Sequence, residues 1–503
     1  MLKEADDTLI NEEQMGYRRI MKATSLFGGV QVLTIAISVI RSKFIAVLLG
    51  PGGMGIAGLL TATLSLISQI TNFGLSTSAI KDISAAHSTG DDSKVSLIVT
   101  VFRRIMWVTG LVGAVITAVT APWLSELAFG NRDYTFAFIL LSITLVFNQI
   151  SAGQSVLLRG LRQIKMMAKS AALGSTLGLV TTVPLYYFFG IGGIVPAIII
   201  ASVFSLLLTW FYASKLKIPS AEVSAKRTFN EVKGMLKLGF LISLSSMITL
   251  AASYVVRIFI SNTGSVEQVG LYNAGFAIVN TYVGMIFTAM STDFYPRLSG
   301  IAHDNKQSAN AINQQAEIAI LIMAPVIMVF LTFINWVVII LYSSKFTPIN
   351  DMILFAVLGM MFKAASWAVA IVFLAKGAGK LFFWNELIAN VYQLAFNILG
   401  YKFWGLAGIG ASFLLSYLIY LIQVYIITSR TYGFRFTWEF YKLFGLQLIL
   451  AVSCFMAVKF INDPWSYIAG SVFIIISGIH AYKELDKRLS IRDLLSKFGR
   501  KQK

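Results

Sequence analysis

The sequence predicts an all-α, polytopic membrane protein with 14 transmembrane helices, in two pseudo-repeated six-helix lobes followed by two C-terminal helices. Three observations support this class: the composition, the spacing of apolar runs and an internal repeat. Hydrophobic residues make up 57% of the 503 residues and charged residues 13%, against about 45–50% and about 25% in soluble proteins. So few polar groups could not cover a soluble enzyme of this size.

A helix that crosses the bilayer needs about 20 mostly apolar residues. Because the first 22 residues are polar, we expect no cleavable signal peptide there. No run shows the strict alternation of a membrane β-barrel strand. The predicted spans, in order, are 23–49, 54–80, 100–121, 135–158, 170–189, 193–213, 238–261, 269–291, 316–342, 351–374, 382–400, 404–428, 443–461 and 466–482.

The distribution of lysine and arginine sets the orientation. With the N-terminus inside, 33 of the 41 basic residues fall in the predicted inner segments, and four lie outside, namely Arg132, Lys345, Lys402 and Lys459. This is the bias that the positive-inside rule describes. We therefore expect both termini in the cytoplasm, and the net charge of +18 requires no nucleic acid as a partner.

The residues that build most catalytic and metal sites are scarce. One cysteine, Cys454, excludes intramolecular disulfides, and His87, His303 and His480 are far apart in the sequence. The glycine-rich segment 50–55 fits a dinucleotide motif, but no strand precedes it. We expect no enzyme, no metal and no bound cofactor.

Short polar motifs recur along the chain. The segment 34–41 returns as 249–257, and Gly55–Gly58 returns as Gly270–Gly275, both at an offset of 215. A third pair is offset by 217: the segment 158–162 and the segment 375–379. Six spans separate the copies, so both run in the same direction, as in transporters with parallel repeats.

The repeat divides the chain. The predicted parts are a cytoplasmic segment 1–22, an N-lobe 23–213, a cytoplasmic linker 214–237, a C-lobe 238–428, two further spans within 429–482 and a basic tail 483–503. We expect the tail to lie on the anionic inner leaflet or in solvent.

Polar side chains follow one face of four predicted spans. Two explanations remain open: hydrogen bonding between helices or to their own backbone, and a wet cavity shared by the lobes. The four stripes are Gln31, Thr34, Ser38 and Arg41; Ser246, Thr249, Ser253 and Arg257; Thr61, Ser65, Gln69, Asn72 and Ser76; and Glu386, Asn390, Gln393 and Asn397.

Charges within spans are costly, about 2.5–3.5 kcal/mol each on insertion scales, and usually face protein or water. Lys363 lies near the middle of its span, and Arg41 somewhat outward of the middle. Arg257 and Lys43 are nearer the outer end and could reach the interface by snorkelling. With Glu386 as the acid that stands clearly within a span, the interior is net positive, which suits an anion such as a phosphate.

Three roles are open for Glu386. It could pair with Lys363, carry a coupling proton, or cap the start of the span 382–400.

The pattern resembles a known family. The chain resembles the polysaccharide flippases of the MOP (MATE-like) superfamily in its fourteen spans, arranged as six, six and two. It also resembles them in two short segments, Gly55–Gly58 and 294–299. The segments 127–134 and 157–162 are similar to the Wzx translocases of O-antigen and enterobacterial common antigen. The resemblance runs through about twelve spans, and the first lobe lacks the arginine cluster of the lipid II branch.

The resemblance implies a flippase of the bacterial inner membrane that moves an undecaprenyl-diphosphate-linked oligosaccharide outward by alternating access. It also implies a proton or sodium gradient, with a polysaccharide polymerase and a chain-length regulator as partners beside membrane lipids. Arg41, Arg257 and Lys363 would attract the diphosphate. The residues expected to bind sugar are Gln31, Ser38, Asn72, Asn273, Asn280 and Asn390.

The alternatives are a lipid II-type flippase, a MATE-like antiporter of small molecules or cations and, more distantly, a membrane glycosyltransferase or polymerase. A cation antiporter should display buried acids. A polymerase should have a large outer loop or an acid-bearing site, and the sequence has neither.

Overall fold

The computed structural model describes the backbone of residues 2–216, 218–219, 221, 223 and 225–489. Side chains are described for these residues except those of 2–32, 225–242, 282, 285, 288, 289, 292 and 489. This part of the chain is helical throughout, with short connections and no strand, which confirms the predicted all-helical class. Ten helical segments in it are long and apolar enough to cross a membrane.

Three of these ten segments are long enough for two passes. Helix α13 (Gly379–Tyr432) has 54 residues, about 80 Å at 1.5 Å per residue, whereas the hydrocarbon core is about 30 Å thick. Its backbone leaves the helical region at Trp404 and Gly405. The Ser412 hydroxyl donates to the carbonyl of Phe396 at 2.6 Å, so the two halves of α13 fold back on one another.

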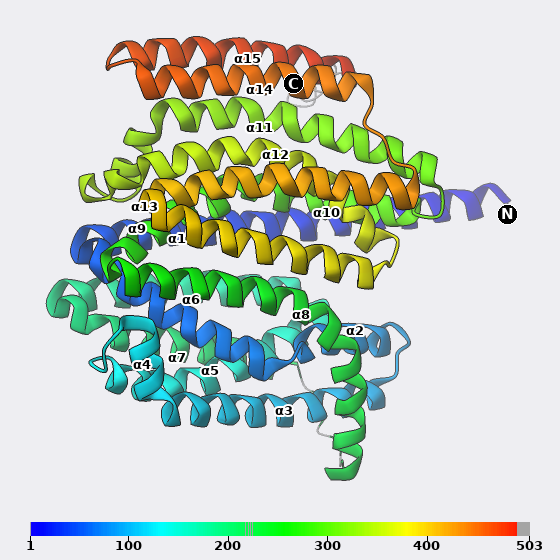
Figure 1. The fold of residues 1–503 in the computed structure, drawn as a ribbon. Helices are drawn as coiled ribbons and strands as arrows, with labels where there is room; N and C mark the ends of the chain where they lie inside the picture. The colour runs from blue at the N-terminus through cyan, green and yellow to red at the C-terminus, as the bar shows by residue number, and fades with distance from the viewer. Residues whose placement is uncertain (1, 217, 220, 222, 224, 490–503) are drawn as a thin grey trace, which may run out of the picture. The chain divides into compact units, whose positions relative to one another are not determined.

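The other two long segments are interrupted at glycines. Helix α1 (Leu2–Asn72) breaks at Gly50, with φ 66° and ψ −171°, and reverses direction there (Figure 1). Helix α6 (Ile164–Phe189) is followed by η1 (Gly190–Gly193) and α7 (Ile194–Ser214). A positive φ at these breaks costs glycine little because it has no Cβ.

Several helix boundaries differ from those predicted. The second span was expected to run over 54–80, but α1 ends at Asn72 and α2 (Leu75–Ser88) begins after Phe73 and Gly74, both with positive φ. Instead of one helix over 269–291, the chain forms α9 (Val266–Ala277), a π-helical turn η2 (Ile278–Val283) and α10 (Met285–Gly300).

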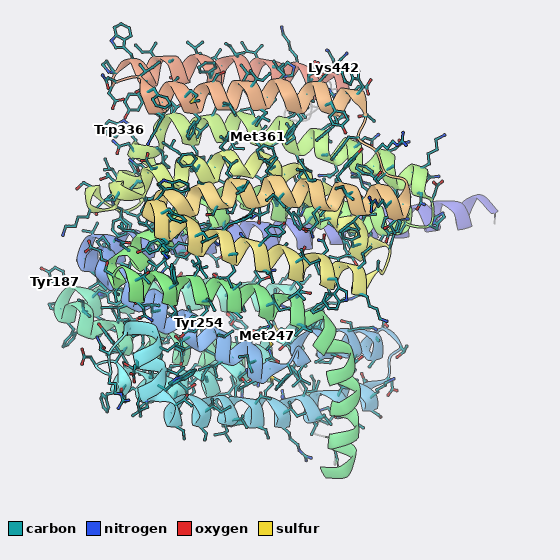
Figure 2. All side chains as sticks on the ribbon, in the orientation of Figure 1. Tyr187, Met247, Tyr254, Trp336, Met361 and Lys442 are labelled. Atoms are coloured by element: carbon teal, nitrogen blue, oxygen red, sulfur yellow. The ribbon has the colours of Figure 1, made fainter. Side chains whose placement is uncertain are left out.

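The chain divides into two compact units, Met1–Val266 and Glu267–Lys503. The first contains α3 (Asp92–Val119), α4 (Ala121–Phe129), α5 (Thr135–Gly160) and α8 (Ala225–Thr263) besides the helices above. Its buried apolar cluster includes Ile83, Phe102 and Leu157. The Tyr254 hydroxyl lies 2.8 Å from that of Thr63, which fixes α8 against α1 (Figure 2).

The chain between the two predicted lobes lies along α3. The Arg104 guanidinium donates to the carbonyl of Val223 at 2.7 Å, and the backbone N–H of Ala221 donates to the hydroxyl of Thr100 at 3.1 Å. Ser96 donates to the carbonyl of Pro219. The predicted linker 214–237 therefore contacts α3 at Pro219, Ala221 and Val223, and α8 begins within the linker.

The second unit contains α11 (Asn305–Leu341), η3 (Ser344–Ile349), α12 (Asn350–Ala375), α14 (Trp438–Phe460) and α15 (Trp465–Leu489). Helix α12 is central: Met361 is fully buried, whereas Trp336 of α11 is 54% exposed and projects at the edge (Figure 2). Helices α14 and α15 lie side by side and pack on α11. The fully buried amide of Gln447 on α14 accepts from Ser477 on α15 at 2.7 Å.

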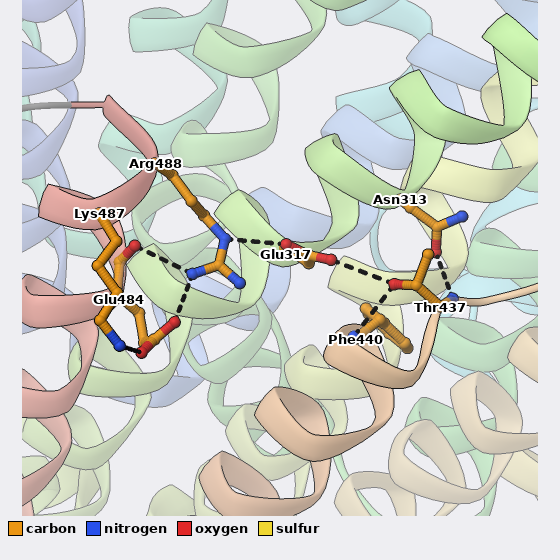
Figure 3. Close-up of polar contacts among 7 residues, drawn as sticks. All are labelled: Asn313, Glu317, Thr437, Phe440, Glu484, Lys487 and Arg488. Carbon is orange, nitrogen blue, oxygen red and sulfur yellow. Dashed lines mark hydrogen bonds and ion pairs between the residues drawn. The ribbon is translucent and has the colours of Figure 1, made fainter.

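A polar network joins α11, α14 and α15 near one end (Figure 3). The Arg488 guanidinium donates to Glu317 at 2.9 Å and to Glu484 at 2.5 Å. Glu317 also accepts from the hydroxyl of Thr437, which caps the first turn of α14. The predicted basic tail 483–503 is thus helical over its first residues and ion-paired there, and 490–503 lie outside the described residues.

Parts of the two units share one local geometry at an offset of 215. Helices α5 and α12 each have 26 residues. In the turns that follow these helices, Arg162 and Gly377 both have positive φ, 56° and 67°. Each backbone hydrogen bond at Leu161, Arg162 and Gln163 has a counterpart 215 residues later whose length agrees within 0.1 Å. Gly190 and Gly405 also match, with φ 54° and 57° and ψ −131° and −139°. The repeated segments at these turns therefore align at 215, not at the predicted 217.

Candidate functional site

The second unit holds a lysine in the middle of a candidate span. Lys363 on α12 is half-buried and donates from Nζ to the Asn280 amide oxygen at 3.3 Å. Nζ also lies over the ring of Tyr417 at 5.0 Å and that of Phe413 at 5.6 Å from the centroids. Both rings belong to the second half of α13, so the fold-back of that helix forms one wall around the ammonium group.

A π-helical turn presents the amide that holds Lys363. Asn280 is the third residue of η2, and π-turns inside helices often occur at functional sites. The turn ends at Gly284, whose N–H donates to the carbonyl of Val279 at 3.1 Å. A Cβ at Gly284 would collide with the Asn280 carbonyl, so glycine is required at this position.

An acid lies close by on the first half of α13. The Glu386 carboxylate accepts from the Tyr420 hydroxyl at 2.5 Å and from the Asn385 amide at 3.3 Å. Asn385 is 1% exposed and is held in turn by Gln423, whose amide donates to its side-chain oxygen at 2.8 Å. The Asn390 amide donates to the backbone carbonyl of Glu386 at 2.8 Å. Glu386 is thus surrounded by neutral donors.

The contacts of Glu386 in the structure match neither a pairing with Lys363 nor a cap at the start of its helix. Among the described residues, no ion pair joins it to Lys363, and it stands two turns inside α13, which begins at Gly379 with Ala378 as its N-cap. The role in carrying a proton stays a prediction. The two charged groups are connected through rings, because Tyr417 beneath Lys363 contacts Tyr420 edge-on, with centroids 6.2 Å apart.

The two predicted arginines lie in the first unit. Arg41 on α1 is exposed, and Ser38 one turn away is half-buried. The Arg257 guanidinium folds back along α8 and donates to the Ser253 carbonyl at 2.9 Å and to its hydroxyl. Arg257 therefore bonds to its own helix. Lys43 is half-buried.

The remaining predicted sugar ligands are scattered over both units. The Asn72 amide donates to the Ser76 hydroxyl at 2.9 Å across the break between α1 and α2. Asn273 is half-buried on α9, Asn280 holds Lys363, and Asn390 is buried. The Gln31 side chain lies outside the described residues.

The hydroxyls of two stripes bond mainly to their own helices. Thr61 donates to the carbonyl of Ala57 at 2.7 Å, Ser65 to that of Thr61 at 2.7 Å, and Thr249 to that of Ser245 at 3.1 Å. These contacts support the backbone explanation for the serines and threonines, since a helix satisfies such hydroxyls by itself. The amide and charged members of the stripes remain as ligand candidates.

Sequence reasoning missed the tyrosines and amides that surround the two charges. Tyr417, Tyr420 and Gln423 are three residues apart in the span 404–428, a helical spacing that could have been recognised as a fifth polar stripe. Asn385 precedes Glu386 and lies off its stripe. Glu317 was also missed, because it stands at the edge of the predicted span 316–342, yet it is only 8% exposed.

Solved structures of transporters share this fold. A lipid II flippase, MurJ, in an inward closed conformation superposes with a TM-score of 0.71 at 12% identity, covering 92% of this chain and 99% of that one. An inward-facing multidrug resistance MATE transporter of the MOP superfamily has a TM-score of 0.66 at 16% identity, covering 80% and 94%. A MOP superfamily transporter from Pyrococcus furiosus, described as having a binding pocket of reversed polarity, has 0.58 at 14%, covering 82% and 96%.

The sequence itself matches flippases and a family. The lipid III flippase of Escherichia coli (strain K12) is 21% identical over 417 residues, which cover 80% of this chain and 96% of that protein. The same match is found with the lipid III flippase of Shigella flexneri. These similarities confirm the predicted resemblance to the MOP superfamily and the prediction of a transporter rather than an enzyme. A family described as "Polysaccharide biosynthesis protein" matches residues 44–353, more than half of the chain, and the chain therefore belongs to that family.

Proposed function

We propose that this protein is a flippase that moves an undecaprenyl-diphosphate-linked oligosaccharide, such as an O-antigen repeat unit, from the inner to the outer leaflet. The observation that carries the proposal is the environment of Lys363. Its ammonium group lies mid-span against a neutral amide and two aromatic rings, and the described residues offer it no carboxylate within ion-pair distance. A cation without a counter-charge at this depth favours an anionic ligand.

The chemistry of a diphosphate suits such a group. Lysine binds phosphate as a point charge, and arginine can hold it with two parallel hydrogen bonds. Arg41 and Arg257 are the candidates for this second kind of contact, and Gln31, Ser38, Asn72, Asn273, Asn280 and Asn390 for sugar hydroxyls. A membrane potential that is negative inside favours outward movement of an anion by about 2.3 kcal/mol per charge per 100 mV.

The relatives support this class of substrate. The Escherichia coli protein is a lipid III flippase, and the structure with a TM-score of 0.71 is a lipid II flippase. A lipid II-type substrate is therefore the nearest alternative. A MATE-like cation antiporter is less consistent with the site, because a cation would meet the Lys363 ammonium, while the carboxylate of Glu386 already accepts from two neutral donors.

The cycle is alternating access by rocking of two six-helix lobes, 23–213 and 238–428, about the linker 214–237. Glu386 is the candidate carrier of a coupling proton, and a sodium gradient is the alternative. The setting is a bacterial inner membrane with both termini cytoplasmic, in agreement with the positive-inside bias. A polysaccharide polymerase and a chain-length regulator are the expected partners.

The test replaces Lys363 and measures surface glycan export together with protein abundance in a strain that lacks the native gene. Lys363→Ala should abolish export at near-normal abundance, because no buried partner is left unpaired. Lys363→Arg should retain part of it. Lys345→Ala, an exposed lysine in η3, is the matched control and should export normally.

Two results would count against the proposal. Normal export by both Lys363→Ala and Arg41→Ala would remove the diphosphate-binding role. A loss of abundance in Lys363→Ala that Glu386→Gln restores would make the lysine a structural partner of the acid instead.

A further inference from the structure

Helix α5 of the first unit has two exposed faces of different character. One carries Phe136, Leu140 and Ile143, which are 40–68% exposed and are suited to lipid. The other begins about 120° further round the helix and carries Asn148, which is exposed, and half-buried Ser155. These two residues are seven apart and so lie on one line along the helix.

Asn148 is an unusual residue for its depth. It follows the first residue of α5 (Thr135–Gly160) by about 20 Å, which is near the middle of a candidate span. Among the residues that the structure describes, none forms a hydrogen bond with its amide. A primary amide left in hydrocarbon costs several kcal/mol. The face that carries Asn148 is therefore expected to meet water or a polar ligand, not lipid.

The internal repeat relates this position to the lysine of the second unit. With the offset of 215 that the matching turns establish, Asn148 corresponds to Lys363. Each lies at the same depth of a 26-residue helix, α5 or α12. The two positions differ in charge: the second unit has an ammonium group, and the first has a neutral amide with two donors and one acceptor.

We propose that Asn148, with Ser155 on the same face, binds hydroxyl groups of the oligosaccharide part of the substrate. The inference rests on the proposed flippase function. A neutral amide offers a diphosphate little, but its paired donors and acceptor match adjacent sugar hydroxyls. The two repeat-related positions thus differ in chemistry: the ammonium group of the second unit suits an anion, and the amide of the first unit suits hydroxyl groups.

The first experiment asks whether the face is wet. Cys454 is fully buried and is the single cysteine of the chain, so Asn148→Cys and Ile143→Cys are made in a Cys454→Ser background. The purified proteins in nanodiscs are treated with a water-soluble maleimide. Asn148→Cys should react at least about tenfold faster than Ile143→Cys, because thiolates form and react in water. Equal rates would overturn the proposal.

The second experiment separates the two kinds of ligand. Asn148→Leu keeps the shape of the side chain and removes its hydrogen bonds, which at about 1 kcal/mol corresponds to roughly fivefold weaker glycan binding. Glycan export should fall accordingly at normal abundance, while the affinity for undecaprenyl diphosphate without sugar stays unchanged. Lys363→Ala should weaken that affinity at least tenfold.

The outcomes are distinguishable. Unchanged export by Asn148→Leu would refute the glycan site and leave the flippase proposal intact. The glycan site would also be refuted, with the flippase proposal intact, if Asn148→Leu lost as much affinity for undecaprenyl diphosphate as Lys363→Ala does. Undiminished affinity of Lys363→Ala for undecaprenyl diphosphate would instead refute the proposed function on which the site rests.

Discussion

The ionic network at the end of α15 predicts that Glu317 and Arg488 stabilise the second unit jointly. The Glu317 side chain is 11% exposed and that of Arg488 is 25% exposed, so water screens this pair less than a surface pair. A hydrogen bond between charged groups contributes about 1.5–3 kcal/mol. Arg488 keeps its contact with Glu484 at 2.5 Å when Glu317 is replaced. We therefore expect a coupling energy between Glu317 and Arg488 near the lower end of this range, about 1.5 kcal/mol.

The assay is a double-mutant cycle of Glu317→Gln and Arg488→Met, with thermal unfolding of the purified protein as the readout. Lys487→Met is the control, because Lys487 also pairs with Glu484 but its side chain is 71% exposed, and such surface pairs contribute about 0–1 kcal/mol. A cycle without coupling would refute joint stabilisation by Glu317 and Arg488, and so would a Lys487→Met variant whose unfolding temperature falls as much as that of Arg488→Met.

Three further predictions concern transport and topology. Gly284→Ala should lower glycan export per unit of protein in the membrane, since a Cβ there displaces the Asn280 carbonyl; export per unit of protein equal to wild type would show that the π-turn is dispensable. Glu386→Gln should slow gradient-driven transport while substrate binding persists, and unchanged pH dependence of transport would exclude a coupling proton. Cysteines in 122–134 should react with an impermeant reagent in intact cells, whereas cysteines in 214–237 should be protected; labelling of the latter would reverse the orientation.

The helices were predictable from the sequence because the bilayer imposes long apolar runs. Their breaks were harder to predict. Phe73 adopts φ 45° between α1 and α2. Phenylalanine has no preference for that conformation, so the sequence does not predict it there. The π-turn at 278–283 lies within an ordinary apolar run. Both features depend on tertiary packing, which a hydropathy pattern does not contain.

The repeat shows a similar limit. Similar residue types in the two repeat segments pair Arg159 with Lys376, but the turn geometry pairs Arg162 with Gly377. Basic residues gather at inner loops wherever they fit, so their exact positions in a loop are weakly specified. The backbone path of the turn fixes which residue adopts a positive φ. The positive-φ residues, Arg162 and Gly377, therefore align the two copies of the repeat.

The charged members of the site were predictable, but their surroundings were not. Lys363 and Glu386 stood out because charge within a span is costly. Tyr420 is 34 positions from Glu386 and reaches it because α13 folds back on itself. Tyrosines are common in membrane helices, so their sequence positions alone did not mark them as neighbours of an acid.

The proposed function assigns the transport of a diphosphate-linked glycan to Lys363. The most direct measurement is reconstitution in liposomes with a fluorescent undecaprenyl-diphosphate-linked sugar, in which transfer between leaflets is followed by chemical quenching of the exposed leaflet. The lipid should change leaflets faster in liposomes with wild-type protein than in protein-free liposomes. A negative-inside potential should accelerate the outward transfer further. Lys363→Ala should remove both accelerations. Equal rates for wild type, Lys363→Ala and protein-free liposomes would contradict the account.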